Sequence, residues 1–290
     1  MRRGSALSGR LAVLAAAALF STGGAVIKAI DLSGWQVASF RSGIAALALL
    51  ALIPASRRAA SWRALGVGVV YAATLVLFVQ ANKQTTAASA IFLQSSAPFY
   101  VLLLSPWLLR ERVRRSDLAL MAALAVGLAL LFVGLDAASP TAPRPLLGNV
   151  LGAAAGLTWA CTVMGLRALG RAGGPGAAAG AAVLGNALTF LVCLPLALPA
   201  RGGGAGDWAG VLFLGVVQVG LAYVFLTRAM PRVPAFEASL LLLLEPVLNP
   251  IWAWLAHGER PGAWSLAGGA LILAATAVKT WLDAGRSSAA

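Results

Sequence analysis

Charged residues are scarce in this chain of 290 residues, and acidic residues are the scarcest of them. Asp, Glu, Lys and Arg together make up 11% of the sequence, whereas soluble domains carry about 25%. Only 9 residues are acidic against 22 basic ones, while 60% of the residues are hydrophobic. This composition excludes a soluble globular domain and predicts an integral membrane protein.

Residues that build catalytic and metal sites are also rare. The chain has one histidine, His257, and two cysteines, Cys161 and Cys193, which lie in separate apolar segments. The sequence has no GxxxxGK[ST] phosphate-binding loop, no HExxH zinc motif and no GxSxG nucleophile motif. We therefore expect no enzyme activity, no metal, no cofactor and no direct use of ATP.

Ten apolar runs are long enough for a membrane-spanning helix, which needs about 20 residues. Short connections with Gly or Pro separate these runs, so the sequence predicts an all-α integral membrane protein with ten transmembrane helices. The predicted spans are Leu11–Ile30, Trp35–Ile53, Leu65–Asn82, Thr86–Leu109, Asp117–Leu135, Leu146–Leu166, Ala177–Leu198, Trp208–Ala229, Ala235–Ala256 and Trp264–Trp281.

The net charge of +13 comes from basic residues spread over the short connections. This pattern is typical of the cytoplasmic loops of membrane proteins rather than of nucleic-acid binding, so we expect no nucleic-acid partner. With a cytoplasmic N-terminus, 16 of the 22 basic residues lie on the inner side, and an even number of spans returns the C-terminus there. Both termini are therefore predicted to be cytoplasmic.

The second half of the sequence repeats the first after a shift of 148 residues. Pro98 and Glu111 of the first half align with Pro246 and Glu259 of the second. Five spans per half is an odd number, so the halves are predicted to be inverted-topology repeats, formed by residues 1–140 and 141–290. Secondary transporters use such repeats to alternate between inward-open and outward-open states. A structural duplication without transport is the alternative.

The motifs of the two halves resemble those of a known family. The second half has Glu245-Pro246-Val247, then Glu259 and the paired glycines Gly268-Gly269, whereas the first half has Ala97 before Pro98. On these motifs the sequence resembles the EamA family of the drug/metabolite transporter superfamily over essentially its full length. The resemblance implies ten helices and transport of small metabolites, and it leaves the substrate open.

Glu245 lies in the middle of an apolar span, where an acidic residue costs roughly 3 kcal/mol. Glu237, Asn249 and Trp252 share its helix face, so this face is predicted to line a cavity. Glu245 is expected to bind a substrate ammonium or to carry a coupling proton. The alternative is a latch that holds two helices together.

Arg41 lies about six residues inside its span, or roughly 9 Å deep. We expect it to bind a substrate carboxylate or to pair with an acid such as Asp31. Lys28 and Lys83 lie near helix ends, where a lysine can snorkel to the membrane surface. Glu111 and Glu259 are expected to have structural roles at the interface.

Polar and aromatic residues on other spans are predicted to complete the lining of the cavity, with helix-to-helix contact as the alternative role. The candidate substrate-binding or coupling residues are Glu245, Arg41, Tyr71, Phe78, Asn82, Gln94, Trp159, Gln218, Tyr223 and Asn249, with Pro98, Pro246 and Pro250 as hinges.

The sequence therefore predicts a secondary transporter in the cytoplasmic (inner) membrane of a bacterium. It is expected to move small polar metabolites, amino acids or related compounds, by alternating access, with export favoured and protons as a candidate coupling ion. A lipid or head-group flippase of the same fold and a facilitative permease without ion coupling are the alternatives. The lipid bilayer is the surrounding partner, and the sequence leaves a monomer or a homodimer open.

Overall fold

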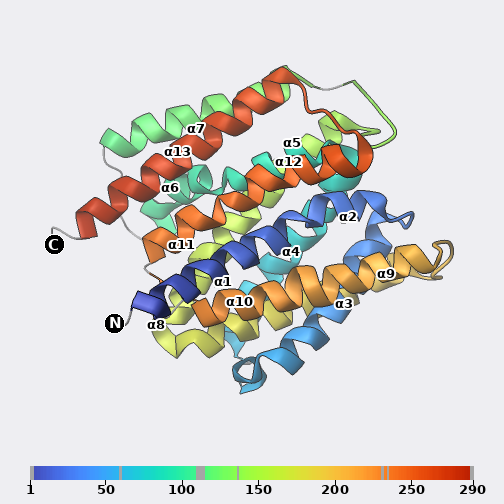
Figure 1. The fold of residues 1–290 in the computed structure, drawn as a ribbon, viewed down its shortest axis with the longest axis horizontal. Coiled ribbons are helices and arrows are strands. Elements are labelled where there is room, and N and C mark those ends of the chain that lie inside the picture. Colours follow the sequence, from blue (N-terminus) through green and yellow to red (C-terminus); the bar gives the residue numbers. More distant parts are fainter. Residues whose placement is uncertain are drawn as a thin grey trace.

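The computed structural model describes residues 3–58, 61–108, 115–135, 137–229, 232–233 and 235–287. Helices make up nearly all of these ranges and run side by side in one tilted bundle, which confirms the all-α prediction (Figure 1). The helices are α1 Arg3–Ser21, α2 Gly23–Ala29, α3 Gly34–Leu52, η1 Pro54–Arg58, α4 Trp62–Gln84, α5 Ala87–Ser95, α6 Ala97–Leu108, α7 Arg115–Val133, α8 Pro145–Ala197, α9 Ala205–Phe213, η2 Leu214–Leu221, α10 Ala222–Ala229, α11 Ala235–Leu242, α12 Leu244–His257 and α13 Ala263–Ser287.

Within the described ranges, nine helical stretches are long and apolar enough to cross a membrane. They overlap nine of the predicted spans. The tenth predicted span, Asp117–Leu135, corresponds to the apolar but shorter helix Asp117–Val133. The count of ten transmembrane helices therefore stays a prediction.

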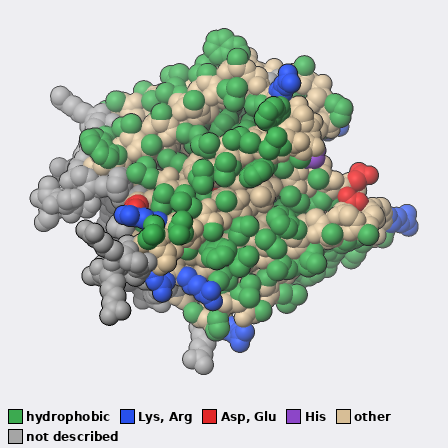
Figure 2. All heavy atoms as spheres, in the orientation of Figure 1, with side chains coloured by type: hydrophobic (Ala, Val, Ile, Leu, Met, Phe, Trp, Pro, Cys, Tyr) green, Lys and Arg blue, Asp and Glu red, His purple; other side chains and the backbone are tan. Residues whose placement is uncertain are grey.

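The outer surface of the bundle is apolar. On the face shown in Figure 2, hydrophobic side chains cover the middle, and charged side chains lie mainly toward the two ends of the helices. Large apolar side chains such as Leu47, Val192 and Leu255 are exposed. Such an apolar belt is unfavourable in water but suits contact with lipid. Helices suit the same environment, because their backbone groups are paired within the helix.

Helix α8 contains two spans that pack against α4 in opposite directions. Its first arm, Pro145–Leu169, runs from the C-terminal end of α4 toward the N-terminal end of α4. Its second arm, Gly176–Ala197, runs back along α4 in the opposite direction. The chain therefore reverses between the two arms, in the region where the sequence predicted a Gly-rich connection. The contacts, in chain order, are Gly148 with Thr85, Gly165 with Val67, Gly185 with Tyr71 and Thr189 with Ala72.

Several described spans are interrupted near their middle. The α1–α2 pair breaks at Thr22, the α5–α6 pair at Ser96 and the α11–α12 pair at Leu243, while the π-helix η2 interrupts the span between α9 and α10. Hydroxyl side chains satisfy carbonyls next to two of the breaks: Thr22 donates to Leu19 O at 2.7 Å, and Ser96 donates to Leu93 O at 2.6 Å. Interrupted helices of this kind are tolerated in membranes only inside a protein or beside a wet cavity.

The predicted hinge prolines lie at or near these breaks. Pro98 and Pro246 stand in the first turn of α6 and α12, where a backbone N–H would have no helical partner in any case. Pro250 lies inside α12. The two breaks, at Ser96 and Leu243, are 147 residues apart, close to the shift of 148 residues found in the sequence.

The two halves of the chain exchange contacts. Helix α1 of the first half packs on α10 and α12 of the second, whereas the first arm of α8 packs on α4 and α5 of the first half. The first span of each half therefore lies against the third and fourth spans of the other half.

The bundle has two distinct ends. Both chain termini lie at one of them, which we call the terminal end (Figure 1). The connections after α2, α4, α7, α8 and α12 lie at the opposite end, which we call the loop end. The cytoplasmic placement of both termini stays a prediction.

Candidate functional site

Polar side chains from five helices meet in the interior of the bundle. The hydroxyl oxygens of Tyr71 on α4 and Tyr223 on α10 lie 3.1 Å apart. Arg41 on α3, Asn186 on α8 and Glu245 on α12 all lie close enough to interact with the Tyr71 side chain. We call these five residues the central group. The structure thus brings together Arg41, Tyr71, Tyr223 and Glu245, four of the residues that the sequence singled out.

Arg41 carries a buried positive charge without an ionic partner. Its side chain is 3% exposed, and it has no hydrogen bond or ion pair to a residue that the structure describes. The predicted pairing with Asp31 is wrong, because the ion pairs of the described chain include none between Asp31 and Arg41. A guanidinium inside a membrane protein is costly unless it is paired, and the described chain provides no charged partner for Arg41.

Glu245 lies in the first turn of α12, directly after the break at Leu243. The start of a helix favours a carboxylate because its N–H groups carry partial positive charge. The Glu245 side chain is partly exposed, lies near both Tyr71 and Tyr223, and forms no ion pair with the rest of the described chain. Both interpretations of Glu245, a substrate or proton site and a latch between helices, therefore stay predictions.

Aromatic rings cover the two tyrosines. The ring centroids of Tyr71 and Trp159 are 6.2 Å apart, and those of Tyr223 and Phe20 are 5.6 Å apart. Trp159 was a sequence candidate, but Phe20 was missed. In the sequence, Phe20 lies in an apolar run that does not mark it as a site residue. The structure distinguishes it by its position just before the helix break at Thr22.

Two other candidates flank the α1–α2 break rather than joining the central group. Gln218 is 6% exposed and donates to Phe20 O at 3.2 Å, while its Oε1 has no partner among the described residues. Asn249 is 1% exposed and lies against Gly24, and neither polar atom of its side chain has a described partner. These amides have unused hydrogen-bonding capacity in the interior.

The remaining candidates lie elsewhere. Phe78 is part of the main apolar core, and Asn82 lines a hollow at the loop end. Gln94 is partly exposed and lies just before the break at Ser96. None of these three side chains joins the contacts of the central group.

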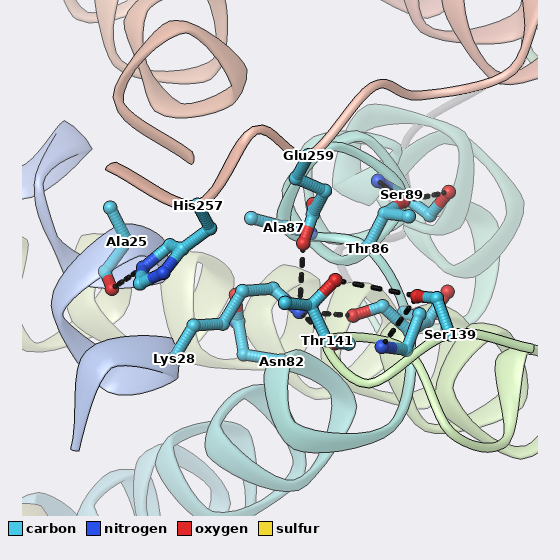
Figure 3. Close-up of polar contacts among 12 residues, drawn as sticks. Ala25, Lys28, Asn82, Thr86, Ala87, Ser89, Ser139, Thr141, His257 and Glu259 are labelled. Atoms are coloured by element: carbon cyan, nitrogen blue, oxygen red, sulfur yellow. Dashed lines mark hydrogen bonds and ion pairs between the residues drawn. The ribbon is translucent and has the colours of Figure 1, made fainter. Parts of the chain in front are cut away.

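The loop end contains a buried ion pair that sequence reasoning missed (Figure 3). Lys28 Nζ lies 3.1 Å from Glu259 Oε2, and the two side chains are 2% and 3% exposed. Lys28 also donates to Thr85 O at 2.8 Å and to Thr141 O at 2.5 Å, and the Ala87 N–H donates to Glu259 Oε1 at 2.5 Å. The snorkelling prediction for Lys28 is therefore wrong, because buried acceptors hold its ammonium inside the protein.

Two other polar contacts lie at the same end. His257 hydrogen-bonds to Ala25 O at 2.8 Å, and Lys83, partly exposed, donates to Ile30 O at 2.5 Å. Glu259 thus has a defined partner in Lys28, whereas its predicted counterpart Glu111 lies outside the described residues.

Two hollows lie on either side of the Lys28–Glu259 pair, with volumes of about 230 and 470 Å³. Pro140 and Thr141 line both of them. The smaller one also involves Lys28, Asp31, Asn82 and Lys83, and the larger one Thr86, Ser139, His257, Glu259 and Arg260.

The family model described as the EamA-like transporter family matches residues 7–133 and 146–281. The chain belongs to the EamA-like transporter family. It is 30% identical over 282 residues to the pseudopaline exporter CntI of two Pseudomonas aeruginosa strains, covering 92% of this chain and 94% of the relative. It is 29% identical over 217 residues to an uncharacterized transporter of Archaeoglobus fulgidus, covering 72% and 73% of the two chains.

This EamA-family chain also shares its fold with a solved crystal structure. The two are 23% identical, with a TM-score of 0.62 and coverage of 95% of this chain and 97% of the other. Family membership makes the protein a multi-pass membrane transporter and not an enzyme. The resemblance found in the sequence is confirmed.

Proposed function

We propose that this EamA-family protein exports amino acids or related small zwitterionic metabolites across the inner membrane of a bacterium. The observation that carries the proposal is the central group. Arg41 and Glu245 are of opposite charge type, both interact electrostatically with Tyr71, and neither has an ionic partner among the described residues. Two unpaired charges inside a membrane protein are costly, and a ligand that carries both complementary charges offsets that cost.

Each residue of the central group has a chemical role in this proposal. The Arg41 guanidinium binds the substrate carboxylate, since its planar array of N–H donors matches two carboxylate oxygens. The Glu245 carboxylate binds the substrate ammonium. The Tyr71 and Tyr223 hydroxyls orient the polar atoms, and the Trp159 ring covers the apolar part of the substrate.

Alternating access accounts for the architecture around this group. The near-equivalent helix breaks at Ser96 and Leu243, together with Pro98 and Pro246, supply hinges in both halves. The exchanged contacts between halves and the two separate family matches support a division into two inverted repeats, at residues 1–140 and 141–290. In this mechanism, the repeats rock around a central site without ATP.

The direction and coupling are also part of the proposal. Export is favoured by the relative named as a pseudopaline exporter. Glu245 is the candidate proton carrier, because it is partly exposed and has no fixed cationic partner in the described chain. A facilitative permease needs no such carrier, so the pH dependence of transport separates the two mechanisms.

The test compares the culture media of cells that express wild type, Glu245→Gln, Arg41→Gln or an empty vector, by untargeted mass spectrometry. Glu237→Gln is the matched control. Although Glu237 was predicted to share the cavity face of Glu245, the structure places its carboxylate in a partly exposed ion pair with Arg10 and not in the central group. We expect an amino-acid-like compound to accumulate with wild type and with Glu237→Gln but not with the two central-group variants.

Equal accumulation with Glu245→Gln at equal membrane abundance would remove Glu245 from the mechanism. A pH gradient imposed on proteoliposomes then tests coupling: wild type is expected to respond to the gradient, and Glu245→Gln is not. Scrambling of labelled lipid by purified protein, without movement of amino acids, would replace this proposal with the flippase alternative.

A further inference from the structure

The buried ion pair at the loop end joins segments that are far apart in the chain. Lys28 lies near the end of α2, and Glu259 lies in the connection between α12 and α13. The Lys28 ammonium also holds Thr85 O after α4 and Thr141 O before α8, and Glu259 holds the N–H of Ala87 at the start of α5. One charged pair thus fastens five segments together (Figure 3).

The pair also divides the space at the loop end. Lys28 lines the smaller hollow and Glu259 lines the larger one, while Thr141, which accepts from Lys28, lines both. Separation of Lys28 from Glu259 would join the two hollows into one opening. This opening would lie beside Asn82 on α4. Asn82 shares a face of that helix with Tyr71 of the central group.

The energetics of such a pair suit a switch better than a permanent support. A buried ion pair contributes little net stability, because the desolvation of both charges offsets their attraction. Its separation within a dry protein is nevertheless costly, since each charge is left without compensation. The pair therefore separates only together with the entry of water, which makes the loop end either closed or fully open.

We propose that Lys28 and Glu259 form the outer gate of the transporter. The pair is intact while the central group is closed to the outside, and it separates when substrate leaves. The proposal rests on alternating access in the proposed function and on the predicted outer position of the loop end. Its test needs no knowledge of the substrate.

The surroundings of the pair identify the informative substitution. Glu259→Gln keeps an oxygen that accepts from the Ala87 N–H, and it leaves Lys28 with its two carbonyl acceptors, so the local hydrogen bonds survive while the ionic attraction is lost. Lys28→Met removes all three contacts of the ammonium and is the harsher variant. Lys83→Met is the matched control, because Lys83 lies at the same end but forms no ion pair in the described chain.

The experiment measures how fast a membrane-impermeant maleimide labels Ser89→Cys from outside the cell. Ser89 is 1% exposed and accepts a hydrogen bond at 2.9 Å from Thr86, which lines the larger hollow, so this near-isosteric change places a buried thiol next to the hollow that Glu259 lines. Cys161 and Cys193 are replaced by serine in every variant. Abundance and detergent-solubilised melting temperature of each variant are measured in parallel.

We expect slow labelling with the gate intact and with Lys83→Met. Glu259→Gln is expected to raise the labelling rate about tenfold, which corresponds to about 1.4 kcal/mol of the lost charge-assisted contact. Lys28→Met is expected to raise it further, and where that variant does not fold, Glu259→Gln decides. An unchanged labelling rate in folded Glu259→Gln would overturn the gate.

Fast labelling only in inside-out vesicles would overturn the outer assignment. Failure of the gate and failure of the proposed substrate are distinguishable. Faster labelling in Glu259→Gln without any exported amino-acid-like compound supports the gate and removes the substrate proposal. An exported compound with an unchanged labelling rate removes the gate alone.

Discussion

The α1–α2 span and the α11–α12 span, with the connection after it, are joined by one ion pair at each end of the bundle. The two ion pairs differ in their exposure to water. At the terminal end, Arg10 of α1 pairs with Glu237 of α11, and the two side chains are 51% and 27% exposed. At the loop end, Lys28 and Glu259 are almost completely buried and are held by three further backbone groups. The loop end is therefore closed by buried polar contacts, and the terminal end is closed at its surface.

This difference teaches which end opens at the lower cost. An exposed ion pair exchanges readily with water and is worth about 0–1 kcal/mol. A buried pair cannot separate gradually, because each charge needs a replacement for its partner. The conformation in the structure is thus the one in which the loop end is firmly closed and the terminal end is the easier to open.

The largest expected effect on stability comes from removing one partner of the buried Lys28–Glu259 ion pair at the loop end. Lys28→Ala leaves the buried Glu259 carboxylate without a cation, and we expect the free energy of unfolding to fall by about 3–5 kcal/mol. The melting temperature of the detergent-solubilised protein measures the loss. A melting temperature equal to that of Arg10→Ala would show that burial makes no difference between the two ion pairs.

An intermediate effect is expected from packing at the loop end. Gly148 lies in the first turn of α8, where an added Cβ would come within 2.5 Å of Thr85 backbone and side-chain atoms. Gly148→Ala is therefore expected to cost about 1–3 kcal/mol by the same measurement. Gly66→Ala on α4 is the control, since its Cβ would meet nothing within 4 Å and alanine favours a helix. Equal melting temperatures for the two variants would contradict tight packing there.

The smallest effect is expected at the terminal end. Arg10→Ala removes an exposed pair, and the free energy of unfolding should change by at most about 1 kcal/mol. Because salt screens exposed charges, the difference from wild type should shrink further between low and high ionic strength. A double-mutant cycle with Glu237→Ala isolates the pair, and a large coupling energy that is insensitive to salt would contradict the comparison.

The sequence was sufficient to predict nine of the spans and to single out Arg41 and Glu245, the two charged residues of the central group. Apolar length and the cost of a buried charge are local properties, so Arg41 and Glu245 could be recognised without knowing their neighbours. The role of Lys28 could not be recognised in this way. Its position near a helix end is compatible with snorkelling, and only the fold shows that Glu259 and two carbonyls lie within reach.

Helical periodicity also has a limit that the α4 residues make visible. Spacings of 7 and 4 residues put Tyr71, Phe78 and Asn82 on one face of the helix, but a shared face says nothing about depth. At 1.5 Å per residue, Phe78 and Asn82 lie about 10 and 16 Å further along the axis than Tyr71. Asn82 accordingly reaches the loop-end hollow while Tyr71 belongs to the central group.

The π-helix η2, Leu214–Leu221, sets the rotational phase of α10. A π-turn contains about one residue more than an α-turn, so the helix after it is rotated by roughly 100° relative to an uninterrupted α-helix. Tyr223 follows directly after η2 and faces Tyr71 only with this offset. The meeting of the two tyrosines therefore depends on an effective insertion of a single residue, and restoring regular α-helical winding would turn Tyr223 away without changing its identity.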